Sequence, residues 1–142
     1  MRYVLDSSVA LKWVLPEVNS DKAERLRDRA RQGDDDFIAP DFFPIECGHA
    51  LFRAEAKGIL KSGEPAKLLA ALLQDCPQLL STRQLLRRAA GFCNVWRKPW
   101  FYDAQYVALA EEQQVQFITA DTKLIHHVKP DFPDILDLVD FP

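Results

Sequence analysis

Short apolar segments alternate along this chain with longer segments in which apolar residues recur every three or four positions. Each short segment predicts a β-strand, and these segments are Arg2–Asp6, Phe37–Ala39, Gln78–Ser81, Gln116–Asp121 and Ile135–Val139. The third segment is too short for its pattern to separate a strand from a helix. Nearly continuous apolar strands are typical of a parallel sheet that is covered on both faces.

The segments with helical spacing lie between these predicted strands. They are Val9–Leu15, Ser20–Arg31, Pro44–Gly58, Glu64–Asp75, Leu85–Val95, Ala104–Gln113 and Thr122–Val128. The segment Ala104–Gln113 is apolar on nearly every side, which predicts a helix buried at the centre of one sheet face. Strands that alternate with helices predict an α/β fold with right-handed crossovers. We therefore expect a three-layer α/β/α domain around a mainly parallel sheet of about five strands.

Local signals mark the ends of the second helical segment. Asp21 and Glu24 have the spacing of a capping box at its start. Gly33 is a residue favoured just past a helix end. The acidic residues Asp34–Asp36 come next and predict a solvated turn, because consecutive carboxylates usually lie on the surface.

Length and composition fit one soluble globular domain. The chain has 142 residues, of which 48% are hydrophobic and 27% charged, so residues 1–142 are expected to form a single domain. No apolar run approaches the roughly 20 residues of a membrane span and no signal peptide precedes the first strand, so we expect a cytoplasmic protein. Three cysteines without C-x-x-C spacing argue against a zinc site. The net charge of −3 argues against bulk attraction to nucleic acid but not against a local basic groove.

Four carboxylates occupy corresponding places in the predicted fold. Asp6 and Asp121 each end a strand, while Glu46 and Asp103 each lie where a helix begins. Taken singly, Asp6 and Asp103 fit helix caps and Glu46 fits a surface acid. Taken together, they would meet at one sheet edge and repel one another unless a cation neutralised them. Ligation by oxygen alone favours Mg²⁺ or Mn²⁺ over zinc.

These acids lie within four segments that resemble the motifs of PIN-domain proteins. The segments are Leu5–Trp13, Pro44–Leu51, Tyr102–Ala110 and Ile118–Asp121, which occur in the family's order with suitable gaps over nearly the whole chain. The most similar branch is that of the VapC-like toxins of toxin–antitoxin pairs. The resemblance implies a metal-dependent ribonuclease that is often homodimeric and is inhibited by a small antitoxin. One departure is His49, where the family's helix motif often has Asn three residues after the Glu.

The resemblance also assigns the acids to a shared site. The family's acidic residues correspond to Asp6, Glu46, Asp103 and Asp121, of which we expect the three aspartates to be metal ligands. Glu46 would complete the metal shell or act as a base, and the sequence leaves both roles open. Hydrolysis of RNA by a metal-activated water should leave a 5′-phosphate.

Further residues are candidates for supporting roles. Ser7 and Thr119 are candidate hydroxyl partners of the ligands, and His49 is a candidate second partner, although helix capping and strand packing explain the hydroxyls equally well. Arg97 and Lys98 lie in an aromatic tract just before the third acid, which suits single-stranded RNA. Solvation of the two cations is an equally good explanation.

Competing functional readings share the acidic site. A DNA-directed or structure-specific nuclease would use the same four acids, since hydrolysis at a metal needs no 2′-hydroxyl. A scaffold that binds RNA or protein without cutting it is a further alternative, and the four intact acids argue against it. A receiver-type signalling domain would need paired acids after the first strand, where this chain has Ser7 and Ser8.

Overall fold

The strand β1 (Arg2–Leu5) lies at the centre of a five-stranded sheet in the computed structural model, which describes residues Met1–Pro142. The strand order is β3-β2-β1-β4-β5 and every neighbouring pair is parallel. The other strands are β2 (Asp36–Pro40), β3 (Gln78–Leu80), β4 (Gln116–Thr119) and β5 (Ile135–Asp137). The predicted α/β class is therefore confirmed, and the segment that its pattern left open is a strand.

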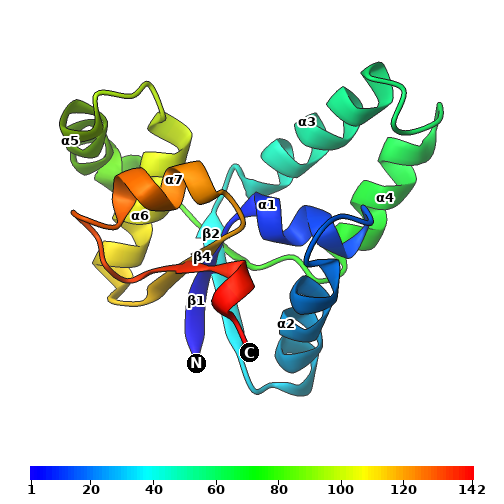
Figure 1. Ribbon diagram of the computed structural model, residues 1–142, viewed down its shortest axis with the longest axis horizontal. Helices are drawn as coiled ribbons and strands as arrows, with labels where there is room; N and C mark the ends of the chain where they lie inside the picture. The colour runs from blue at the N-terminus through cyan, green and yellow to red at the C-terminus, as the bar shows by residue number, and fades with distance from the viewer.

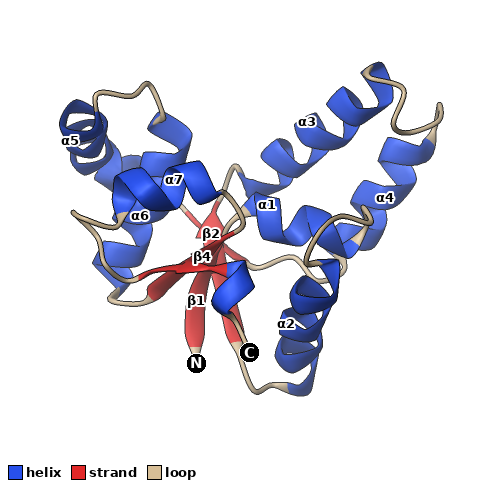
Figure 2. Cartoon of the chain, viewed as in Figure 1, coloured by secondary structure: helices blue, strands red, loops and turns tan.

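Helices cover both faces of this sheet (Figures 1 and 2). On one side lie α1 (Ser7–Ala10), α2 (Ser20–Gln32), α3 (Phe43–Ala56) and α4 (Glu64–Leu73), and on the other lie α5 (Leu86–Trp96), α6 (Phe101–Gln113) and α7 (Thr122–Val128). Short 3₁₀ turns occupy Leu11–Trp13 (η1), Arg83–Leu85 (η2) and Leu138–Asp140 (η3). This distribution gives the predicted three layers. None of these helices is both long and apolar enough to cross a membrane.

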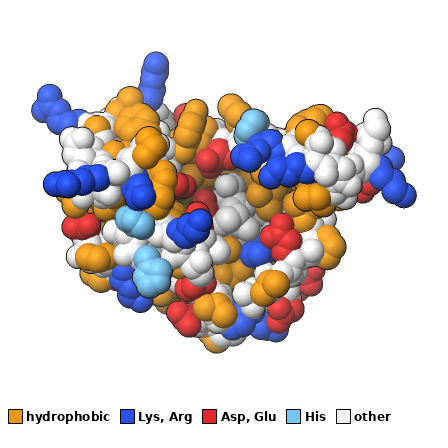
Figure 3. Space-filling view, turned by 45° about the horizontal axis from the view of Figure 1, so that its top comes forward, with side chains coloured by type: hydrophobic (Ala, Val, Ile, Leu, Met, Phe, Trp, Pro, Cys, Tyr) orange, Lys and Arg blue, Asp and Glu red, His pale blue; other side chains and the backbone are white.

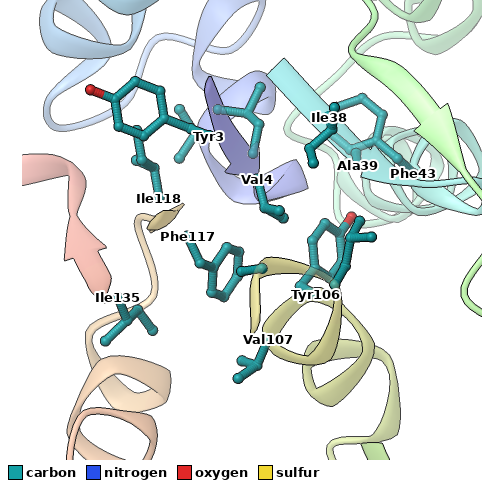
Figure 4. Packing of buried hydrophobic residues seen from close by; sticks show 14 of the residues in the cluster. Tyr3, Val4, Ile38, Ala39, Phe43, Tyr106, Val107, Phe117, Ile118 and Ile135 are labelled. Carbon is teal, nitrogen blue, oxygen red and sulfur yellow. The ribbon is translucent and has the colours of Figure 1, made fainter. Parts of the chain in front are cut away.

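The helix α6 forms the centre of the core on its side of the sheet. All residues of its segment Ala104–Ala110 are buried, and the helix contacts β1, β2 and β4. Tyr106 stacks on Phe117 of β4 with ring centroids 5.6 Å apart and an interplanar angle of 18° (Figure 4). Burial of each large apolar side chain of this kind contributes roughly 1.5–3 kcal/mol. The core thus fixes where α6 begins relative to the strand ends.

Three local expectations are wrong. The capping box of α2 does not form: the preceding residue, Asn19, is left-handed with φ 65° and makes no capping bond with its side chain. Asp35 is buried and paired with Arg29, so Asp34–Asp36 are not a purely solvated turn. The last strand ends at Asp137, because this side chain accepts a hydrogen bond from the Val139 amide and begins a 3₁₀ turn.

Candidate metal and active site

The four predicted acids lie at the carboxyl-terminal edge of the parallel sheet. Asp6 directly follows β1, and its amide donates to the Ile118 carbonyl of β4 at 3.0 Å. Asp121 lies two residues beyond the end of β4. Glu46 and Asp103 occupy the first turns of α3 and α6. Figure 3 shows acidic side chains in a hollow between the two groups of helices.

The pKa values of three of these acids indicate that the side chains lie close enough for their charges to interact. The pKa of Asp6 is raised mainly by burial, with a further contribution from the charge of Asp121. The pKa of Asp103 is raised to about 7, first by burial and then by the charges of Asp6, Glu46 and Asp121. Burial also raises the pKa of Glu46 to about 7, and the charge of Asp6 adds to this rise. The fold therefore keeps each of the four acids close enough to others of the group for their charges to repel.

Hydroxyl groups hold the Asp6 carboxylate. Ser8 Oγ and Thr119 Oγ1 both donate to Asp6 Oδ2 at 2.6 Å. These hydroxyls are themselves fixed, because Ser8 Oγ accepts from the Ala120 amide and Thr119 Oγ1 from the Asp121 amide, each at 3.1 Å. Both side-chain bonds to Asp6 fall on one oxygen, so its Oδ1 makes none.

Asp121 and Glu46 are each held through one oxygen as well. Asp121 caps α7, since its Oδ1 accepts from the amides of Lys123 and Leu124 at 3.0 and 3.1 Å. Glu46 Oε1 accepts from the Tyr106 hydroxyl at 2.6 Å. In each case the second carboxylate oxygen has none of these donors. Asp121 Oδ2 therefore takes no hydrogen bond, whereas the Glu46 carboxylate has the Ser7 side chain as a second hydrogen-bonding partner.

Asp103 differs from the other three because no hydrogen bond or ion pair holds its side chain. The helix α6 begins at Phe101, so Asp103 is its third residue and Trp100 occupies the capping position. The interpretation of Asp103 as a helix cap is therefore excluded. Its carboxylate stays half-buried among other acids without a structural partner.

No cation of the protein neutralises the four acids, because none of its ion pairs includes Asp6, Glu46, Asp103 or Asp121. The donor set consists of carboxylate and hydroxyl oxygens, which suits Mg²⁺ or Mn²⁺. No three His, Cys, Asp or Glu side chains are gathered closely enough to form a finished ligand group. The residues fit a hard divalent cation by chemistry and charge, and a bound ion would have to draw them together.

The candidate supporting residues have different surroundings. Thr119 contacts Asp6 as expected, and Ser7 stabilises the carboxylate of Glu46 through its side chain. His49 is exposed on α3 and makes no hydrogen bond to any of the acids. Sequence reasoning missed Ser8 and Tyr106 as partners of the acids. The position of Ser8, two residues after Asp6, is the one local signal that could have indicated it.

The candidate RNA-binding cations lie on the loop between α5 and α6. Arg97 is exposed and left-handed, with φ 55°, at the end of α5. Lys98 Nζ lies 5.5 Å from the ring centre of Trp100, which in turn packs edge-on against His127 at 4.9 Å. Neither cation contacts an acid of the site in this structure, so their role in binding RNA stays a prediction.

The sequence of the chain matches one known family of proteins, and its fold resembles a solved structure. Residues 3–129 match the PIN domain family, and the chain therefore belongs to that family. The chain is similar to Ribonuclease VapC3 of Pyrobaculum aerophilum, with 28% identity over 126 residues that cover 87% of this chain and 92% of that protein. It also resembles the crystal structure of PAE2754 from Pyrobaculum aerophilum, with a TM-score of 0.68 and 19% identity over 98% of this chain and 93% of that chain. This last similarity shows the fold alone.

Proposed function

We propose that the protein is a Mg²⁺- or Mn²⁺-dependent endoribonuclease that acts in the cytoplasm as the toxin of a toxin–antitoxin pair. The observation that carries this proposal is the group of four acids at one edge of the sheet, none of which is paired with a cation of the protein. The name of the VapC3 relative supports RNA as the substrate. Membership of the PIN domain family supports the same reaction class.

Each residue of the site has its own proposed role in hydrolysis. Asp6 and Asp121, each anchored through one oxygen, would hold the metal with the other, and the unanchored Asp103 would close on it. When bound, a divalent ion supplies charge neutralisation at the scissile phosphate and activates a water molecule. We propose that Glu46 either completes the ligand set or accepts a proton from that water. Arg97 and Lys98 are proposed to contact the RNA strand beyond the cleaved bond.

The test is cleavage of an end-labelled single-stranded RNA with Mg²⁺ or Mn²⁺ and with EDTA. We expect cleavage with metal only, a 5′-phosphate on the new end, and a loss of several orders of magnitude in a folded Asp103→Asn variant. A single-stranded DNA of the same sequence separates the ribonuclease from a DNA-directed nuclease. If Asp103→Asn cleaved RNA at the wild-type rate, the acidic edge would take no part in the reaction. If the protein binds RNA without cleaving it, the alternative function of a non-catalytic scaffold is favoured.

An antitoxin is proposed to bind a groove between η1 and the α3–α4 pair. This groove of about 620 Å³ has apolar side chains such as Leu11, Val14 and Leu68, and Arg53 and Lys57 also line it. Glu17 and Glu64 line the groove as well and balance these two cations, so its apolar side chains are what suit an apolar peptide. We propose that an arginine of the partner extends from this groove to the acids, where it would form bidentate bonds. Of the large apolar side chains near this groove in the sequence, Trp13 and Leu51 belong to the core, while Phe52 is exposed.

Expression in cells tests the toxin assignment. Wild-type protein produced alone should stop growth, co-expression of the neighbouring antitoxin should restore growth, and Asp103→Asn should be tolerated. Equal growth of cells with wild type and variant would reject the toxin role and leave the nuclease in place.

We also propose a homodimer, supported by the exposed apolar side chains Ile45 and Phe52 on α3. Sedimentation of the purified protein measures that state directly.

A further inference from the structure

Tyr106 is a fully buried tyrosine whose only side-chain polar group points at the acidic edge. Its exposed fraction is 0%, and its hydroxyl donates to Glu46 Oε1 at 2.6 Å. The ring stacks on Phe117 and meets Phe42 edge-on, with a centroid distance of 5.6 Å in each case. Figure 4 shows the ring of Tyr106 beside that of Phe117. Packing on these sides fixes the hydroxyl in space.

The position of Tyr106 on α6 links two of the acids. It lies three residues after Asp103, so both side chains project from the same side of the helix. One turn of α6 therefore supplies an acid of its own and a donor to the acid of α3. The contact joins residues 60 positions apart in the sequence. No other tyrosine hydroxyl of the chain contacts an acid of the site.

We propose that Tyr106 is a positioning residue that holds Glu46 Oε1 so that Glu46 Oε2 is presented as a metal ligand, an inference that rests on the proposed function. A glutamate has three rotatable side-chain bonds, and ordering it for a ligand role costs free energy. A hydrogen bond from a rigid donor already restricts the glutamate side chain before the metal binds, and so it reduces this cost. Partners that orient ligands in this way typically change metal affinity by about 10- to 100-fold when removed.

The competing explanation is that the Tyr106 hydroxyl merely finds an acceptor because it is buried. In that case Tyr106→Phe would change stability and leave metal affinity unaltered. The substitution keeps the ring, the stacking on Phe117 and nearly the whole side-chain volume. Tyr3 provides a matched control, because it is also buried but its hydroxyl contacts only the Met1 sulfur, at 3.6 Å.

Calorimetric titration with Mn²⁺ tests the inference without relying on cleavage. We expect the Kd for Mn²⁺ to rise about 10-fold in Tyr106→Phe and to stay within twofold of wild type in Tyr3→Phe. In a Glu46→Gln background, Tyr106→Phe should cause no further loss, because its effect acts through Glu46. Cleavage by Tyr106→Phe should be reduced at low Mn²⁺ and recover when Mn²⁺ is raised about 10-fold.

The outcomes separate this inference from the proposed function. If the wild type binds Mn²⁺ and Tyr106→Phe binds it equally well, the inference fails and the nuclease stands. If the wild type binds no Mn²⁺ and cleaves no RNA, both fail. A measurement on the wild type guards against a variant that does not fold: addition of Mg²⁺ should shift the ¹³Cζ resonance of Tyr106 and leave that of Tyr3 unchanged. An unmoved Tyr106 resonance at saturating Mg²⁺ likewise overturns the inference.

Discussion

Replacing Asp103 by Asn should make the metal-free protein more stable at alkaline pH, although the change removes a proposed ligand. The pKa of Asp103 in the folded protein is about 7, against an ordinary value of 3.8, because of burial and the neighbouring acids. The folded state therefore binds more protons than the unfolded state between about pH 4 and pH 7. Stability associated with this group is present below pH 4 and is lost as the pH rises through 7.

The size of the effect follows from the two pKa values. A tenfold change in proton affinity is worth about 1.4 kcal/mol, so the difference between 3.8 and about 7 sets an upper limit of about 4 kcal/mol above pH 7. The side chain is only partly enclosed, and solvent screens part of the repulsion. We expect Asp103→Asn to gain about 2–3 kcal/mol at pH 8 and no more than about 1 kcal/mol at pH 4.5.

Urea unfolding in EDTA at these two pH values measures the free energy of unfolding of both proteins. Asp134→Asn is the matched control, because Asp134 is exposed and its side chain makes no hydrogen bond or ion pair. Addition of Mn²⁺ at pH 8 should reverse the order, since the wild type gains more from the metal than the variant does. If Asp103→Asn were less stable than the wild type at pH 8 in EDTA, the argument that the acids repel one another would be refuted.

Three further predictions concern the site and the core. Mg²⁺ or Mn²⁺ at about 100 times its Kd should stabilise the wild type by about 2.7 kcal/mol and Asp6→Asn much less, as read from Tm. Phe117→Ala should cost about 3–5 kcal/mol in urea unfolding, because it empties a fully buried position against Tyr106. Asp35→Asn should cost about 1–3 kcal/mol at pH 7, because it breaks the pair between the buried Asp35 carboxylate and the half-exposed Arg29. That deficit should shrink below about pH 4, since the pKa of Asp35 is lowered chiefly by Arg29 and the pair is lost on protonation.

The layers and the edge of the sheet were predictable because they depend on local periodicity. The all-round apolar pattern of Ala104–Gln113 required a buried helix, and the structure buries Ala104–Ala110. Parallel strands end at one edge, so Asp6 and Asp121 had to meet there. The fate of Asp35 was not predictable, because Arg29 reaches it from the end of α2 across a turn. A run of three acidic residues does not indicate which of them is buried.

The contacts that orient the acids could not be predicted from the sequence, for a different reason. Thr119 and Asp6 are 113 positions apart, and Tyr106 and Glu46 are 60 apart. Each pair meets only after the sheet has placed β4 beside β1 and has brought the first turns of α3 and α6 to the same edge. A pattern of residue types can indicate that an acid needs a donor, but the donor is chosen by tertiary packing. The sequence therefore predicted the acids better than their partners.

The arrangement of donors around the acids argues that this edge is shaped by something other than folding. A buried carboxylate is stabilised most when both of its oxygens are hydrogen-bonded or paired with a cation. Here Asp6 takes two hydroxyl donors on one oxygen, and Asp103 takes none. Asn or Ser at Asp103 would remove repulsion without opening a cavity, so stability alone favours a neutral residue there. Retaining an unpaired acid in such a place is explained if its missing partner is a divalent cation.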